Sequence, residues 1–111
     1  MKHEMRLHDA PFKLIQNGTK TIEMRLYDEK RQEIQVGDEI EFTNRITDEK
    51  ITTKVIAMHI YSSFADLYRD YDKVSLGYNK DEDANPSDME QYYSKEEQEK
   101  YGVVGIEIQL I

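Results

Sequence analysis

Three charged side chains in the segment from Gly18 to Arg25 have types and spacing that could bind an anion or support a hydrolysis. The segment reads Gly-Thr-Lys-Thr-Ile-Glu-Met-Arg and contains Lys20, Glu23 and Arg25. Arg25 offers a planar fork suited to a phosphate or a base edge, and Lys20 offers a compact cation. Glu23 could accept hydrogen bonds from the exocyclic amine of a nucleobase. The alternative interpretation is a purely structural network of ion pairs between exposed charges.

Catalysis by the same three residues depends on the protonation of Lys20. To act as a base, Lys20 would have to lose its proton near neutral pH. If Glu23 pairs with Lys20, the carboxylate favours the charged ammonium form instead. The local charges therefore favour ligand binding over general-base catalysis.

Aromatic side chains could supply stacking faces for a base, because seven of the eight tyrosines follow residue 60. The candidates are Tyr68, Tyr71, Tyr92 and Tyr93. The alternative for each is packing in the core. Tyr92 and Tyr93 are adjacent and cannot both face inward on one helix, so one of them is expected to be available to a ligand.

A helix and a strand must position the charged segment. Asp9 is expected to cap a short helix that has Pro11 in its first turn and ends at Asn17-Gly18. The alternation from Thr21 to Leu26 predicts a strand with Glu23 and Arg25 on one face.

The rest of the sheet is predicted from the same alternation. Val36-Gly37-Asp38 reads as a turn before a strand that contains Ile40 and Phe42. A longer strand over residues 51–60 has both faces partly covered, as in a small closed sheet. A final strand is expected over residues 103–111.

Short helices are predicted where Ser-x-x-Asp or Ser-x-x-Glu spacing resembles a capping box. These sites begin at Ser63, Ser87 and Ser94. Residues 77–87 are acidic and without periodicity, so they are expected to form an exposed loop that could act as a lid.

Composition limits the class of protein. A chain of 111 residues fits one domain over residues 1–111. The absence of cysteine and of a long apolar run, with no signal-peptide pattern at the start, leads us to expect a cytoplasmic protein away from membranes. The histidines, His3, His8 and His59, lack metal-ligand spacing, so no metal, no histidine-based catalysis and no cofactor are expected.

The charge is −8 overall and is unevenly distributed. Residues 1–31 carry seven Lys and Arg against five Asp and Glu, whereas residues 66–100 carry five against eleven. Such a protein cannot coat nucleic acid without specificity, so any nucleic-acid contact must be local. The N-terminal part is the one suited to hold an anion.

The segment from Gly18 to Arg25 resembles the Gly-x-Lys-Thr-[Ile/Val]-Glu-x-Arg signature of the ASCH family, the activating-signal-cointegrator homology domains. Three further landmarks stand in the order that this family uses: Pro11-Phe12, Val36-Gly37-Asp38 and the 101–106 segment. The resemblance implies an α+β, PUA-like fold, a small mixed β-barrel with short helices covering its openings. It also implies a binding domain for RNA, a nucleotide or a modified nucleoside.

The resemblance leaves three functions open. In the first, the domain binds its ligand in a cleft closed by residues 77–93. The ligand-binding residues are then Lys20, Thr21, Glu23, Arg25, Tyr92 and Tyr93. In the second, the domain is an amidohydrolase acting on N4-acetylcytidine-like nucleosides, or a ribonuclease, with Lys20 and Glu23 as the catalytic residues. A bacterial branch of the family uses Thr, Lys and Glu in this way; Lys20 matches its lysine, but Glu23 stands where its threonine should fall. In the third, the domain is a protein-interaction adaptor with an acidic surface.

Overall fold

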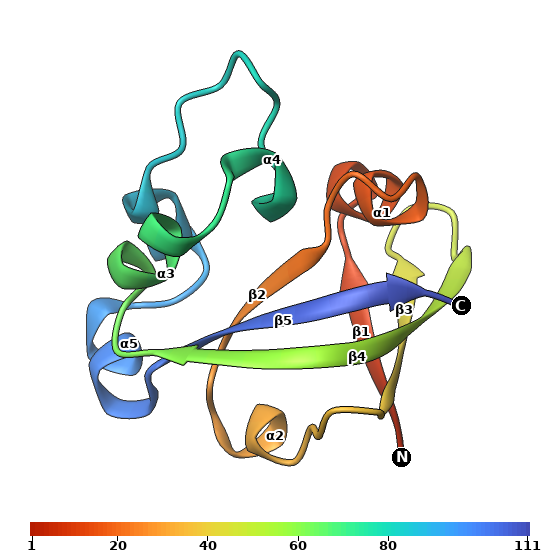
Figure 1. Cartoon of the computed structure of the whole chain (residues 1–111), viewed down its shortest axis with the longest axis horizontal. Helices are drawn as coiled ribbons and strands as arrows, with labels where there is room; N and C mark the ends of the chain where they lie inside the picture. Colours follow the sequence, from red (N-terminus) through yellow and green to blue (C-terminus); the bar gives the residue numbers. More distant parts are fainter.

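The computed structural model describes residues 1–111 and contains one five-stranded mixed sheet. The strands are β1 (Lys2–Leu7), β2 (Ile22–Leu26), β3 (Glu39–Asn44), β4 (Lys50–Tyr61) and β5 (Val103–Leu110). Their order is β1-β3-β4-β5-β2, with β1 parallel to β3 and every other pair antiparallel. The predicted α+β, PUA-like fold is confirmed, and the sheet is a curled half-barrel in which β1 and β2 are the unpaired edges (Figure 1).

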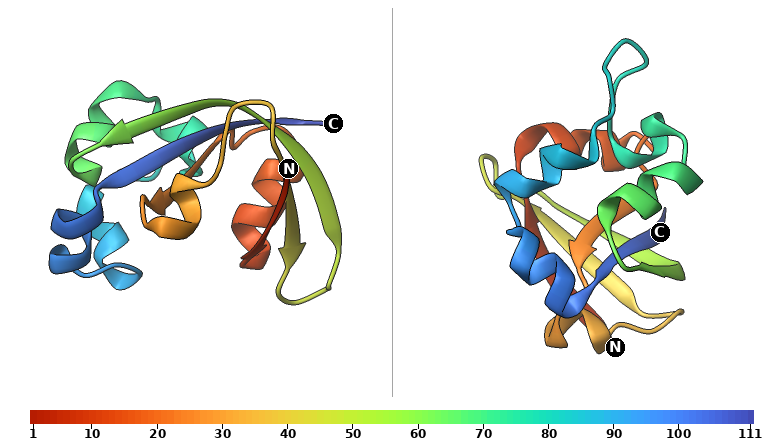
Figure 2. Two further views of the ribbon diagram at one scale, coloured as in Figure 1. Left: turned by 90° about the horizontal axis from the view of Figure 1, so that it is seen from below. Right: turned by 90° about the vertical axis from the view of Figure 1, so that its left-hand side faces the viewer.

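The helices form two groups around this sheet. They are α1 (Asp9–Gln16), α2 (Glu29–Gln32), α3 (Phe64–Asp70), α4 (Lys73–Leu76), the 3-10 helix η1 (Pro86–Gln91) and α5 (Lys95–Tyr101). Figure 2 shows α1 and α2 inside the curve of the sheet, whereas the later helices gather beyond one end of β4. No helix has the length and apolar character needed to span a bilayer.

Two apolar clusters hold these layers together. In the first, Phe12 and Ile15 of α1 pack on strand residues such as Phe42. In the second, Met24 of β2 packs with Phe64 and the other apolar residues of the later helices. Each fully buried side chain of this size contributes roughly 1.5–3 kcal/mol to stability. Strand β5 joins the two clusters, because Val104 belongs to the first and Val103 to the second.

Two of the three predicted serine caps are confirmed. The Ser63 hydroxyl accepts a hydrogen bond from the Asp66 amide at the start of α3, and Ser94 forms a reciprocal capping box with Glu97 at the start of α5. Ser87 is not a cap, because Asn85 caps η1 and bonds to the Ser87 amide. Asp9 is not a cap either: His8 occupies that position, and the Asp9 carboxylate instead accepts a hydrogen bond from Asn44.

The segment after α4 extends away from the rest of the molecule as a loop (Figure 2). Residues 79–85 are exposed, as the acidic composition predicts. Two hydrogen bonds hold the loop at Glu82. The Asn79 amide donates to the Glu82 carboxylate at 2.7 Å, and Lys73 Nζ of α4 donates to the Glu82 carbonyl at 2.6 Å.

Candidate functional site

Lys20 is positioned by the end of α1. Gly18 adopts a positive φ of 83°, as expected for the residue that ends the helix. The Lys20 amide then donates to the Leu14 carbonyl at 3.0 Å, which ties the turn back to the helix. The Lys20 side chain points inward, and only 7% of the residue is exposed.

Two acceptors and one close packing contact hold the Lys20 ammonium. Nζ donates to the Leu76 carbonyl oxygen at 2.9 Å and lies 3.4 Å from Glu23 Oε1. Gly77, which has a φ of 109°, leaves the space that the lysine occupies, because a Cβ there would lie 3.1 Å from Lys20 Cδ. The end of α4 is therefore shaped around this cation.

Glu23 pairs with both cations of the motif. Its Oε2 accepts a hydrogen bond from Arg25 Nε at 2.8 Å, which confirms that these strand residues share a face. Arg25 Nη2 also donates to the Arg6 carbonyl at 3.2 Å. Since Arg6 lies on β1 and Arg25 on β2, this bond connects the two edges of the sheet.

The three charges are buried more deeply than the sequence predicts. The Glu23 side chain is only 5% exposed and that of Arg25 15%, so the ion-pair network of the alternative interpretation is present but is buried instead of exposed. Burial raises the pKa of Glu23, but Arg25 and Lys20 outweigh it and hold the pKa below its usual range. Burial opposes the charge of Arg25, yet Glu23 and Tyr93 raise the pKa of Arg25 above its ordinary value. Glu23 is therefore a stable carboxylate and a weak base.

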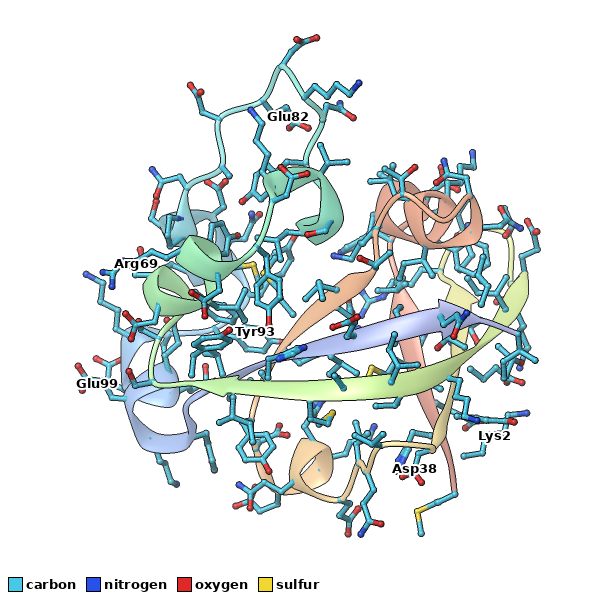
Figure 3. The ribbon with its side chains drawn as sticks, viewed as in Figure 1. Lys2, Asp38, Arg69, Glu82, Tyr93 and Glu99 are labelled. Atoms are coloured by element: carbon cyan, nitrogen blue, oxygen red, sulfur yellow. The ribbon has the colours of Figure 1, made fainter.

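These charges lie in a cleft of about 690 Å³, a size suited to a small organic ligand. One side of the cleft comes from β1, α1 and the β3–β4 turn, and the other from α3, α4, the 77–85 loop and η1. Its polar and aromatic lining comprises Arg6, His8, Lys20, Glu23, Arg25, Arg45, Tyr68, Tyr78, Glu82, Asp88, Gln91, Tyr92 and Tyr93. Figure 3 shows Glu82 in the projecting loop and Tyr93 between the helical group and the sheet.

The tyrosines of the cleft have different roles. Tyr92 is 55% exposed, whereas Tyr93 stacks on Phe64 with ring centroids 6.1 Å apart. The Tyr78 hydroxyl donates to Asp88 at 2.8 Å and is bonded to the Tyr68 hydroxyl at 2.8 Å. Burial, Tyr68 and Asp88 together raise the pKa of Tyr78, so this phenol stays neutral.

The structure brings together five of the six residues predicted to bind ligand. Lys20, Glu23, Arg25, Tyr92 and Tyr93 line the cleft, whereas Thr21 does not. Thr21 uses its backbone to join α4 and β5, since its amide donates to Ser75 and its carbonyl accepts from Ile108. The sequence prediction missed Arg6, Arg45 and Tyr78, which come from segments far apart in the chain. No group of three or more His, Cys, Asp or Glu side chains is arranged to hold a metal ion.

The curled half-barrel with short helices around it is a PUA-like fold. The ASCH domain family matches residues 5–111, so the chain belongs to the ASCH family. The sequence resemblance is thereby confirmed.

Solved structures with the same fold support this assignment to the family. The chain is similar to the hypothetical protein PH0355, at 36% identity over 100% of both chains with a TM-score of 0.84. It is also similar to protein PF0455 from Pyrococcus furiosus, at 34% identity over 100% of this chain and 98% of the other, with a TM-score of 0.73. A mutant of ZmASCH from Zymomonas mobilis shares the fold, with a TM-score of 0.69 at 13% identity over 97% of this chain and 67% of the other. A comparison with curated proteins finds no match.

Proposed function

We propose that this ASCH domain binds a nucleobase of RNA or of a nucleotide in the cleft, with Lys20 and Glu23 recognising the edge of the base. The family is PUA-like and is proposed to bind RNA. The observation that supports base recognition by these residues is the buried ion pair of Lys20 and Glu23 at 3.4 Å, within a cleft lined by four tyrosines. A hydrogen-bond donor and an acceptor thus lie side by side where a planar ligand can stack.

The hydrogen-bonding capacity of the pair is not exhausted within the protein. A lysine ammonium has three N–H donors; Lys20 uses one on the Leu76 carbonyl and pairs with Glu23 Oε1 at 3.4 Å. Glu23 contacts one cation through each oxygen, which leaves lone pairs free because a carboxylate can accept about four hydrogen bonds. An exocyclic amine beside a ring nitrogen or carbonyl, as in cytosine, matches this pattern.

The aromatic lining supplies the second part of base recognition. Tyr92 is exposed enough to receive a base on its ring, whereas Tyr93 is already stacked on Phe64. Stacking on an aromatic side chain contributes about 1–3 kcal/mol per base. Tyr92 is therefore the better candidate for direct contact.

The same electrostatics favour binding over hydrolysis. Glu23 has a lowered pKa, so it accepts a proton poorly from water. Lys20 Nζ is held between the Leu76 carbonyl and Glu23 Oε1, so its contacts are those of a hydrogen-bond donor and an ion-pair partner. No Ser, Thr or Cys lines the cleft, so a covalent route through an aliphatic hydroxyl or a thiol has no residue to start from.

Calorimetric titration of cytidine and uridine into the native protein and two variants tests the proposal. Cytidine should bind more tightly than uridine, because its exocyclic amine offers Glu23 two N–H donors, whereas uridine offers the single N3–H. Tyr92→Ala should weaken binding by about 5- to 150-fold, the equivalent of one stacked base. Lys20→Met should weaken the binding of both nucleosides, because it removes the donor to the ring nitrogen or carbonyl of the base. Controls outside the cleft are Tyr101→Ala and Lys13→Met.

Equal affinity for both nucleosides, or loss of binding in the controls, would contradict the proposal. Incubation of the protein with N4-acetylcytidine tests the alternative function, amide hydrolysis. Robust release of cytidine that disappears in Lys20→Met would make the amidohydrolase function correct instead.

A further inference from the structure

A second concavity, of about 610 Å³, opens beside the cleft and is strongly basic. Its ten lining residues are Glu4, Met5, Arg6, Arg25, Lys30, Arg31, Thr43, Arg45, Asp48 and Lys50. Six of these are Lys or Arg and two are acidic, in a chain whose net charge is −8. The concentration of positive charge is therefore local and contrary to the rest of the molecule.

Half of the six cations have no counter-ion within the protein. Arg25, Arg31 and Lys50 pair with Glu23, Asp28 and Glu41 respectively. The remaining three, Arg6, Lys30 and Arg45, form no salt bridge and are exposed.

Arg31, which also lines the concavity, has an unsatisfied donor below the surface. Its Nη1 is bound to Asp28 at 3.0 Å, while its buried Nε has no hydrogen-bond partner. The concavity thus holds more positive charge and donor capacity than its own residues neutralise. An anionic ligand would supply what is missing.

The concavity is continuous with the cleft, because Arg6, Arg25 and Arg45 line both. Arg25 lies at the junction, where its Nε binds Glu23 in the cleft and its Nη2 binds the β1 backbone. If the base of a ligand occupies the cleft, the part of the ligand that extends out of the cleft toward the concavity would therefore contact three arginines.

We propose that the basic concavity binds the phosphodiester backbone of a single-stranded nucleic acid, one of whose bases occupies the adjacent cleft. This inference rests on the proposed function. Arginine forks bind phosphate oxygens in pairs, which suits a chain of phosphates better than a single neutral nucleoside. A single strand is required because a base must be unstacked to enter the cleft. Continuity with a tyrosine-lined cleft favours nucleic acid over an acidic peptide.

The measurement compares a nucleoside with a short strand. Cytidine and fluorescently labelled five-nucleotide oligocytidylates, one RNA and one DNA, are titrated into the full chain at several salt concentrations. The RNA pentamer should bind at least tenfold more tightly than cytidine at low salt. With about three phosphates neutralised, the plot of log affinity against log salt should have a slope of about −2. Cytidine, which carries no phosphate, should show almost no salt dependence.

A double variant separates the concavity from the cleft. Lys30→Gln with Lys50→Gln changes two exposed residues that line only the basic concavity. It should lower the affinity for the pentamer by about five- to tenfold and reduce the slope of log affinity against log salt, while the affinity for cytidine stays the same. The matched control, Lys95→Gln with Lys100→Gln, removes the same charge from α5, outside both sites. It should leave both affinities unchanged.

The outcomes distinguish the two proposals. Equal affinity for pentamer and cytidine, or equal weakening by both double variants, overturns the inference and leaves the nucleobase proposal standing. Pentamer binding that depends on Lys30 and Lys50 without any cytidine binding supports the inference and contradicts the nucleobase proposal. Equal binding of RNA and DNA pentamers supports recognition through phosphates alone, and tighter RNA binding supports an added contact to the 2′-hydroxyl.

Discussion

At the scale of single residues, Glu23 neutralises two buried cations at once. Replacing it with glutamine keeps the shape but leaves Lys20 and Arg25 without their carboxylate. Removing one partner of a buried ion pair typically costs about 3–5 kcal/mol. We expect Glu23→Gln to lower the free energy of unfolding by about this amount in urea denaturation, with the exposed Glu99→Gln as a nearly neutral control. Equal stability of the two variants would contradict the buried network.

The same carboxylate makes stability depend on pH. Since the pKa of Glu23 is lower in the folded protein, its stabilisation is fully present above the unfolded pKa of about 4.3. It is lost as the pH falls through the lower folded value. The replacement of Glu23 by threonine, which would restore the threonine position of the hydrolytic branch, removes this charge too. Glu23→Thr is therefore expected to lower the free energy of unfolding, even if the new hydroxyl increases catalysis.

Gly77 is the second residue on which the position of Lys20 depends. An alanine there is strained by the φ of 109° and also places Cβ 3.1 Å from Lys20 Cδ and 3.3 Å from Nζ. Gly37, with a φ of 96° and no atom within 4 Å, offers a control with backbone strain alone. Both Gly→Ala variants should lose about 1–3 kcal/mol, measured by thermal unfolding. Only Gly77→Ala should also weaken cytidine binding; an equal effect of Gly37→Ala would show that the lysine contact is unimportant.

At the scale of the elements, the serines distinguish a true cap from a sequence that only resembles one. Ser94 and Glu97 satisfy each other at the start of α5, whereas Ser87 is itself bonded to Asn85. Ser94→Ala should cost about 1 kcal/mol, measured by urea unfolding. Ser87→Ala, chosen as its control, should be close to neutral. A larger loss of unfolding free energy in Ser87→Ala than in Ser94→Ala would mean that the 3-10 helix depends on its serine.

Elements with strong periodicity could be predicted, and those defined by tertiary contacts could not. The alternation around Ile40 and Ile106 predicts β3 and β5, which the structure confirms. Strand β1 was missed because its identity depends on parallel pairing with β3, a contact distant in sequence. Helices α2 and α4 have four residues each, too few to give a helical period.

At the scale of the whole molecule, the site lies where the two edges of the sheet approach each other. The motif residues of the cleft were predictable because they are near neighbours in sequence. Arg6 and Arg45 join them only through the parallel pairing that sets Arg6 opposite Thr43 and Leu7 opposite Asn44. Since neither arginine stands in a recognisable motif, no sequence signal could have found them.

The acidic loop should slow the approach of a polyanion to this opening. Glu82 lines the cleft, and its neighbours Asp81 and Asp83 are exposed. Glu82 also bonds to the Asn79 amide, so the cleaner variant is Asp81→Asn with Asp83→Asn. Its association rate with the RNA pentamer should rise about two- to fivefold at low salt and match that of the native protein in 0.5 M salt. An unchanged rate in stopped-flow measurements would mean that the loop lies outside the approach path.

The projecting loop separates the chain into two parts that the sheet holds together. Exposed loop tips are the preferred sites of protease cleavage, so limited digestion with a glutamate-specific protease is expected to cut first after Glu82. The smaller fragment would contain β5, which is paired with β4 on one side and β2 on the other. The fragments should therefore elute together in gel filtration and separate only in denaturant. The loop would then be a place where the chain can be divided, or joined to another protein, without dismantling the half-barrel.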